Sequence, residues 1–343
     1  MKESEGETPR ALLRRLIAGE NLSGDEAAAF IGAVMDGDYT PVQAAGLLVA
    51  LAAKGETPDE IAGAARAMRE RSVRVEHHLP LVVDVVGTGG DGSNSINIST
   101  MAALVVAAAG FPVAKHGNRA ASSACGSADV LEAAGLPLEI APATASEMLG
   151  GANFTFLFAP RFHPAMRNAG PIRRELGVRT IFNVLGPLTN PARATHQLVG
   201  VAREELVNAV ATVLRMLGVE RGAVVHAANG LDEVAGDVAT RIYSFDESGG
   251  WSWVLDPAAY GVDVPLEAIV GGSVDACRAA FFSILGGEPS PAAKVVALNA
   301  AVVLYAIGAE ARLEDALERA SDILRSALAL RAFERAKELA VRG

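Results

Sequence analysis

A glycine-rich loop, Gly87–Gly92 (GTGGDG), follows an apolar and β-branched run at residues 81–86. Such a run predicts a buried strand that ends at the first glycine. Glycines let the backbone approach a ligand closely and turn its N–H groups toward an anion. A polar segment follows, and then an Ala/Val-rich helix over 99–109, whose N-terminus adds free N–H donors and positive dipole. The sequence therefore predicts a phosphate-binding loop at the end of a strand.

Two common nucleotide-binding motifs fit this loop poorly. It matches G-x-G-x-x-G, but a dinucleotide site begins its helix within the loop and places an acid about twenty residues later. From Gly92 to Ala128 there is no Asp or Glu, in a chain that has 40. A Walker A loop needs a lysine after its last glycine, where Ser93 stands. A tight turn without a ligand is the remaining alternative, but four glycines beside an acid-free window exceed what a turn requires.

A second loop rich in donors follows the expected strand 112–115. It contains the cations Lys115 and Arg119. Hydroxyl donors follow at Ser122, Ser123 and Ser127, and the last of these is expected to N-cap a helix over 128–134. Two donor-rich loops beside each other suit a ligand with two phosphate groups.

An adjacent acid pair, Asp232-Glu233, follows the expected strand 222–227. In α/β sheets, ligands bind outside the carboxyl ends of the strands, so this segment and the two earlier loops are expected to converge there. Mg²⁺ prefers oxygen ligands, typically one or two carboxylates together with substrate oxygens. From the residues alone, a solvated turn is the favoured interpretation of the pair.

The elements that would carry these loops fall into two regions. Capping signals at Thr8-Pro9, Ser23 with Glu26, Thr40-Pro41 and Thr57-Pro58 predict four helices in the first seventy or so residues, with no strand among them. The Ala/Leu face at residues 44–48 is compatible with a core or with an interface. From Leu79-Pro80 onward, strands and helices alternate.

That alternation predicts an α/β fold with a mostly parallel central sheet flanked by helices. We expect a small all-helical N-terminal domain over 1–78 and a large α/β domain over 79–343. Residues 240–273 have no clear period and are expected to be irregular or edge strands. Two or three helices, which include residues 314–341, close the chain. The expected strands are 81–86, 112–115, 154–158, 197–201 and 222–227, and the expected intervening helices are 99–109, 128–134 and 203–217.

Composition and charge exclude several classes of protein. The chain has 343 residues and a net charge of −10, which argues against a general nucleic-acid or membrane-surface binder. Half of its residues are hydrophobic and 5% are aromatic, which suits helices packed on a parallel sheet. The two cysteines form no disulfide framework. With no apolar leader and no run of about eighteen apolar residues, we expect a soluble cytoplasmic protein.

A series of motifs, strongest between residues 81 and 235, closely resembles the anthranilate phosphoribosyltransferase family. These motifs are Val83–Asp91, Asn97–Thr100, Lys115–Arg119, Gly126–Glu132, Phe158–Pro160, His163–Met166, Arg173–Thr180, Phe182–Pro191 and Gly230–Glu233. The resemblance implies transfer of the phosphoribosyl group of 5-phosphoribosyl 1-pyrophosphate (PRPP) to the amine of anthranilate, a step of tryptophan biosynthesis. It also implies a homodimer, a site between the two domains, and helices at about 165–185 that join the small domain.

The resemblance further implies roles for individual residues. It makes Asp232, Glu233 and Ser99 ligands of Mg²⁺, and from the residues alone Ser99 is expected to be the N-cap of the helix that follows. It assigns anthranilate contacts to Gly87, Asn118, His163 and Arg173. The PRPP contacts that it implies are Gly87, Gly90, Asp91, Ser95, Asn97, Ile98, Ser99, Thr100, Lys115, His116, Gly117, Asn118, Arg119, Ala120, Ala121, Ser122, Ser123 and Ser127.

The acceptor explains why no catalytic triad is needed. The aromatic amine of anthranilate is neutral at pH 7, so positioning and electrostatics would do most of the work, with no residue acting as a dedicated catalytic base. Its carboxylate calls for an arginine. Five arginines lie between residues 161 and 179, and the sequence by itself does not choose among them.

Two rival functions remain. A pyrimidine nucleoside phosphorylase shares the fold and a Lys-His-Gly motif, but the acid pair and Asn118-Arg119 favour the transferase. A non-catalytic paralogue that binds nucleic acid is expected to lose the acid pair and to gain positive charge, and this chain does neither.

Overall fold

The computed structural model describes residues 8–120 and 123–342 and divides into two compact units. The first unit comprises the chain up to Ser72 together with His163–Thr189 and Thr212–Leu217. The second comprises Val73–Phe162, Asn190–Ala211 and the chain from Gly218 onward. Within the described residues, no helix combines the length and apolar character needed to cross a membrane.

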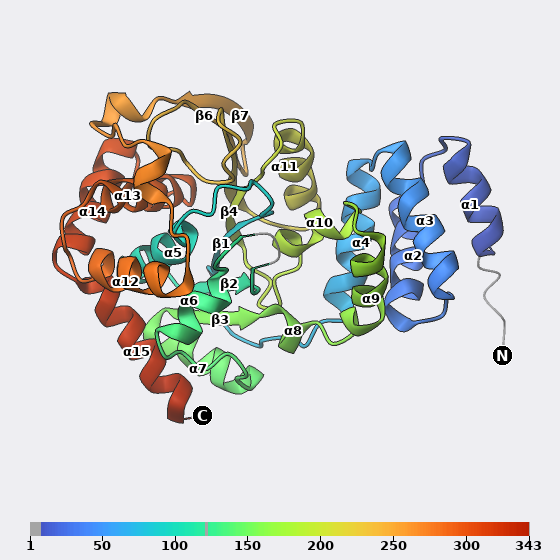
Figure 1. Cartoon of the computed structure of the whole chain (residues 1–343), viewed down its shortest axis with the longest axis horizontal. Helices are drawn as coiled ribbons and strands as arrows, with labels where there is room; N and C mark the ends of the chain where they lie inside the picture. Colours follow the sequence, from blue (N-terminus) through green and yellow to red (C-terminus); the bar gives the residue numbers. More distant parts are fainter. Residues whose placement is uncertain (1–7, 121–122, 343) are drawn as a thin grey trace. The chain divides into compact units, whose positions relative to one another are not determined.

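The first unit begins with the four expected helices (Figure 1). They are α1 (Pro9–Ile17), α2 (Gly24–Asp36), α3 (Pro41–Lys54) and α4 (Pro58–Glu70). The predicted capping signals are confirmed, since each threonine or serine side chain accepts a backbone N–H in the first turn. Gly37 ends α2 with a φ of +82°, a conformation that favours glycine.

Two segments from the middle of the chain complete this unit. Helix α9 (Met166–Leu176) packs against α2 and α3, and the short α10 (Phe182–Leu185) packs against α4. Asn168 Nδ2 donates to the carbonyl of Met35 at 2.7 Å, which joins α9 to the end of α2. Ala44, Leu47 and Leu48 are fully buried, so the Ala/Leu face of α3 is core.

A buried ion pair links α3 to α4. Lys54 Nζ lies 3.0 Å from Glu60 Oε2, and their side chains are 4% and 0% exposed. Glu60 also accepts the backbone N–H groups of Leu22 at 2.8 Å and Thr57 at 2.7 Å. One carboxylate therefore satisfies a helix N-terminus, a loop and a cation at once.

The second unit is built on a seven-stranded sheet of order β3-β2-β1-β4-β5-β6-β7. The mostly parallel sheet is confirmed: the first five strands of the chain are parallel, and the last two are added antiparallel. The strands are β1 (Val83–Gly87), β2 (Val113–Gly117), β3 (Phe154–Phe158), β4 (His196–Gly200), β5 (Arg221–Ala227), β6 (Thr240–Asp246) and β7 (Gly249–Leu255). Residues 240–273 thus contain the edge hairpin β6–β7, followed by the short η2 (Pro257–Tyr260) and η3 (Leu266–Ile269).

Helices cover this sheet (Figure 1). The central helix, α5, packs against β1 and β2 and also against α13, α14 and α15. A helix that is covered on several sides in this way is expected to be apolar on all its faces, as α5 is. The span 314–341 is two helices, since Ala327 takes a φ of +52° between α14 and α15. The helices are α5 (Ile98–Ala108), α6 (Ser127–Ala133), α7 (Pro142–Ala152), α8 (Ala159–Phe162), α11 (Leu206–Met216, partly in the first unit), α12 (Val274–Leu285), α13 (Pro291–Ala306), α14 (Leu313–Arg325) and α15 (Leu328–Arg342).

We predict that Glu60→Gln destabilises the helical unit by about 3 kcal/mol, because it leaves the Lys54 ammonium buried without a counter-charge. The matched control is Glu20→Gln, which removes an exposed partner of Arg15 and should change stability by less than about 0.5 kcal/mol. Urea denaturation followed by far-UV circular dichroism measures both. Equal stabilities for the two variants would contradict the role given to the buried pair.

Candidate active site

The glycine loop leaves the sheet at Gly87, the last residue of β1. Gly89, Gly90 and Gly92 have φ values of +66°, +78° and +73°, which other residues rarely adopt. The loop therefore needs these glycines for its backbone conformation.

The acid pair after β5 binds the backbone of the elements after β1. Asp232 Oδ2 accepts the Gly89 N–H at 2.6 Å, and Glu233 Oε1 accepts the Ser99 N–H at 3.2 Å. Both acidic residues are partly buried. The loop after β5 therefore contacts both the glycine loop and the first turn of α5. It is not the solvated turn that the residues alone favoured.

Two glycines on neighbouring strands make room for Asp232. Gly87 and Gly200 are Cα partners at the carboxyl ends of β1 and β4. A Cβ on Gly200 would lie 1.6 Å from the Asp232 carbonyl oxygen, and one on Gly87 would lie 2.4 Å from Asp232 Oδ2. The acid pair can therefore reach the sheet edge only because neither position has a side chain.

Charge is poorly compensated around the acid pair. Burial raises the pKa of Asp232 to about 6, and the neighbouring Asp91 carboxylate adds to the shift. Burial and the Asp232 charge raise the pKa of Glu233 to about 8, against the opposing pull of Lys115. A cation placed between these carboxylates would remove the repulsion.

Lys115 is the buried cation of the site. It lies on β2 and is 1% exposed, and its Nζ donates to the carbonyl of Val85 and to Ser99 Oγ, the latter at 3.2 Å. Burial lowers the pKa of Lys115, and the charges of Asp84, Glu233 and Asp232 oppose this shift. Lys115 therefore lies within β2, not in the loop after the strand as predicted, and its ammonium reaches the start of α5.

Asp84 and Asn190 bind the backbone of β2, and no sequence motif predicts a role for either residue. The fully buried Asp84 accepts the His116 N–H at 3.2 Å and Asn190 Nδ2 at 2.8 Å. Asn190 Nδ2 also donates to the Ala114 carbonyl at 2.7 Å. Burial raises the pKa of Asp84 to about 6, although Lys115 counteracts it. The feature of the sequence that could have revealed the role of Asp84 is its charge inside an otherwise apolar strand.

The start of α5 differs from the prediction. The helix begins at Ile98, so Ser99 lies in the first turn and is not the N-cap. Asn97 takes the capping position, but its side chain donates instead to the Cys125 carbonyl at 3.1 Å. The Thr100 hydroxyl is buried, and it has no hydrogen-bond partner among the residues that the structure describes.

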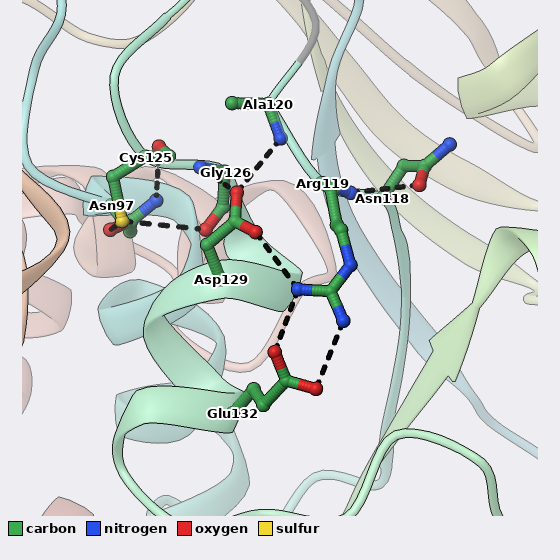
Figure 2. Close-up of polar contacts among 8 residues, drawn as sticks. All are labelled: Asn97, Asn118, Arg119, Ala120, Cys125, Gly126, Asp129 and Glu132. Carbon is green, nitrogen blue, oxygen red and sulfur yellow. Dashed lines mark hydrogen bonds and ion pairs between the residues drawn. The ribbon is translucent and has the colours of Figure 1, made fainter.

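The second loop leads from β2 into α6. Gly126, rather than the predicted Ser127, is the N-cap of α6. The Arg119 guanidinium pairs with both carboxylate oxygens of Glu132, at 2.7 and 2.9 Å, and with Asp129 at 3.1 Å (Figure 2). Its charge is therefore already engaged with α6. Ala121 and Ser122 lie outside the described residues.

The remaining site candidates divide between the two units. Asn118, Ser95 and Ser123 belong to the second unit, together with the residues described so far. His163 and Arg173 belong to the first unit. His163 is buried, and the Arg173 guanidinium lies over the Phe182 ring at 5.4 Å from its centroid. Burial lowers the pKa of Arg173.

The donor set suits a cation shared with a substrate. In residues 8–120 and 123–342 there is no cluster of three or more His, Cys, Asp or Glu able to hold a metal ion by itself. The acid pair offers two carboxylates, and the Ser99 hydroxyl lies nearby. Mg²⁺ is commonly bound by one or two carboxylates together with substrate phosphates. The raised pKa values of both acids fit such a cation.

Comparison with known proteins agrees with this geometry. The α/β domain model of a glycosyl transferase family matches residues 79–330, and its helical bundle domain model matches residues 10–72. An anthranilate phosphoribosyltransferase of Thermomicrobium roseum is 47% identical over 334 residues, 96% of each chain. This chain belongs to the anthranilate phosphoribosyltransferase family.

Solved structures of anthranilate phosphoribosyltransferases support the same assignment. The Thermus thermophilus protein superposes with a TM-score of 0.91 at 45% identity, covering 96% of this chain and 99% of that one. The Saccharomyces cerevisiae protein, solved in complex with PRPP and Mg, gives a TM-score of 0.90 at 26% identity over 98% of both chains. The family expected from the motifs is therefore confirmed.

We predict that Gly200→Ala displaces the backbone of Asp232. Overpacking of this kind costs about 1–3 kcal/mol of stability. Because the displaced carboxylate would no longer be positioned in the site, the rate of the family's transfer reaction should also fall about tenfold or more. Gly150→Ala is the control, because a Cβ there meets nothing within 4 Å. Initial rates and thermal melting are measured for both variants. A Gly200→Ala protein with the wild-type rate would contradict the close packing of Asp232.

Proposed function

We propose that this chain transfers the phosphoribosyl group of PRPP to anthranilate, giving N-(5-phosphoribosyl)anthranilate and pyrophosphate in tryptophan biosynthesis. Family membership supports the reaction class. The observation that carries the proposal is the acid pair bonded to the Gly89 and Ser99 N–H groups, beside buried Lys115. Because both cysteines are free, we place the reaction in a reducing compartment, the cytoplasm.

The chemistry asks for charge stabilisation at the leaving group. The bond from the ribose anomeric carbon to pyrophosphate breaks with its electron pair on pyrophosphate, the anthranilate nitrogen bonds to that carbon, and the amine loses a proton. Such displacements pass through an oxocarbenium-like state, as in glycoside hydrolysis. Donors already aimed at the growing negative charge are the main requirement.

Asp232, Glu233 and Ser99 would hold Mg²⁺ together with oxygens of the donor. When bound, the metal would supply positive charge to the pyrophosphate. The Saccharomyces cerevisiae relative was solved with PRPP and Mg. On the protein side, Lys115 would add a fixed positive charge beside the first turn of α5, and the glycine loop would bring backbone N–H groups close to the donor.

We assign the other donor contacts to the two loops and the first turn of α5. Arg119 would contribute mainly backbone, since its guanidinium pairs with Asp129 and Glu132. The remaining assigned residues are Gly87, Gly90, Asp91, Ser95, Asn97, Ile98, Thr100, His116, Gly117, Asn118, Ala120, Ala121, Ser122, Ser123 and Ser127.

Arg173 would bind the carboxylate of anthranilate, with His163, Asn118 and Gly87 as further contacts. Among the described residues Arg173 makes no ion pair, and burial is the cause of its lowered pKa. A partly buried guanidinium without a carboxylate partner gains most from a ligand that brings one. This supports the choice of Arg173 among the five neighbouring arginines.

The chain would act as a homodimer through its helical unit. Ile17 of α1 and Val42 and Val49 of α3 are 74%, 82% and 40% exposed, so this unit presents aliphatic side chains to its surroundings. A second copy would cover them. Light scattering after gel filtration should give twice the mass of one chain, and a monomer at micromolar concentration would reject the proposal.

The direct test of the function mixes protein, Mg²⁺, PRPP and anthranilate and follows the loss of anthranilate fluorescence. We expect loss that depends on all four components. A stable signal, together with phosphorolysis of thymidine or uridine, would favour the nucleoside phosphorylase instead.

We predict that Asp232→Asn and Glu233→Gln each lower Mg²⁺-dependent kcat about a hundredfold while the fold stays intact, because a preorganised charge is lost. Asp237→Asn is the control: it makes the same change in an exposed residue of the same segment, which accepts the Leu266 N–H. Rates are measured across a Mg²⁺ titration. Undiminished activity in both acid-pair variants would reject the metal assignment.

We predict that Arg173→Ala raises KM for anthranilate about tenfold or more and changes KM for PRPP little, because the lost charge-assisted bonds serve only the carboxylate. Arg174→Ala, at the exposed next position on α9, is the control. Equal rises in both KM values would argue against a carboxylate partner for Arg173.

A further inference from the structure

The loop between β2 and α6 begins and ends on the same carboxylate. Asp129 Oδ2 accepts the N–H of Ala120 at 2.9 Å and the N–H of Gly126 at 2.8 Å (Figure 2). Its other oxygen accepts Arg119 Nη1 at 3.1 Å. One side chain in the first turn of α6 therefore joins residues 119–120 to Gly126.

The base of this loop has no spare room. A Cβ on Gly126 would lie 2.3 Å from the Ala120 nitrogen and 2.9 Å from the Asn118 carbonyl oxygen. The Ala128 N–H donates to that same carbonyl at 3.2 Å. The two ends of the loop are thus in direct contact, and the Asp129 carboxylate binds the N–H groups that this contact brings together.

The bonds to Asp129 favour its charged form. Burial alone would raise its pKa, but the N–H groups of Ala120 and Gly126 and the Arg119 guanidinium lower the pKa below its ordinary value. Hydrogen bonds to a charged acceptor are stronger than neutral ones. The closed base is therefore held by a carboxylate that is ionised at neutral pH.

The closed loop also binds the polar segment that follows the glycine loop. Asn97 Nδ2 donates to the Cys125 carbonyl at 3.1 Å, and the Ala124 N–H donates to Asn94 Oδ1 at 3.0 Å. Ala124 and Cys125 thus hold Asn94 and Asn97 in place, just before α5. Figure 2 shows Asn97 and Cys125 on one side of Asp129 and Arg119 on the other.

We propose that Asp129 is a positioning residue for the phosphoribosyl donor: it holds Ala120 beside Gly126 and so arranges residues 118–120 and 124–126 before the donor arrives. The inference rests on the proposed function, which assigns donor contacts to residues on both sides of this junction. When Asp129 is lost, Ala120 and Gly126 must be brought together as the donor binds, which lowers the affinity for the donor.

The test compares Asp129→Ala with Glu132→Gln. Both remove one negative charge beside Arg119, but Glu132→Gln leaves the bonds to Ala120 and Gly126 intact. We expect Asp129→Ala to raise KM for PRPP about tenfold or more, because two charge-assisted bonds are lost. Changes in kcat and in KM for anthranilate should stay within about twofold, as should every parameter of Glu132→Gln.

Two further measurements keep the test independent of folding and of turnover. Asp129→Asn, which keeps the side-chain volume and one acceptor oxygen, should change KM for PRPP in the same direction by a smaller factor. Amide hydrogen exchange of the substrate-free protein should show faster exchange at Ala120 and Gly126 in the Asp129 variants than in wild type.

An unchanged KM for PRPP in an active Asp129→Ala protein would overturn the proposal, as would equal rises for Asp129→Ala and Glu132→Gln. Unchanged amide exchange would overturn the closure itself. If wild-type protein fails to consume anthranilate, the proposed function is wrong, and amide exchange alone decides whether Asp129 closes the loop.

Discussion

The structure depends on holding two carboxylates, Asp232 and Glu233, against the carboxyl edge of a parallel sheet. Backbone N–H groups of Gly89 and Ser99 bind them, and the paired glycines Gly87 and Gly200 leave the space. Buried negative charge is costly unless it is compensated. Lys115 offsets part of it, and burial and mutual repulsion still raise the pKa of both acids, which favours the binding of a cation.

Under the proposed function, this arrangement would let an acidic chain bind an anionic donor. The net charge of −10 argues against a broad basic surface, so recognition would be local. The fold would supply it through one buried lysine, backbone N–H groups of the glycine loop, and a helix start. The two segments to which donor contacts are assigned are joined to each other by Asn97 with Cys125 and by Asn94 with Ala124.

Local signals predicted much of this from the sequence. Helix caps such as Ser23 with Glu26 and the end of the first strand at Gly87 depend on neighbouring residues, so both are predicted correctly. The second strand is expected to end at Lys115 but continues to Gly117. The roles of Asp84, Asn190 and Asp129 depend on partners brought close only by folding, such as the contact of Asn190 with Asp84 across 106 positions. Ser99 was misassigned as a cap because α5 begins one residue earlier, at Ile98.

The most direct test of the metal site at Asp232 and Glu233 is a crystal structure of the protein with PRPP and Mn²⁺, in which manganese replaces magnesium and gives an anomalous signal. We expect an anomalous peak within ligand distance of the carboxylates of Asp232 and Glu233 and of pyrophosphate oxygens of the donor. Bound PRPP with its manganese away from both carboxylates, or with no manganese at all, would contradict it.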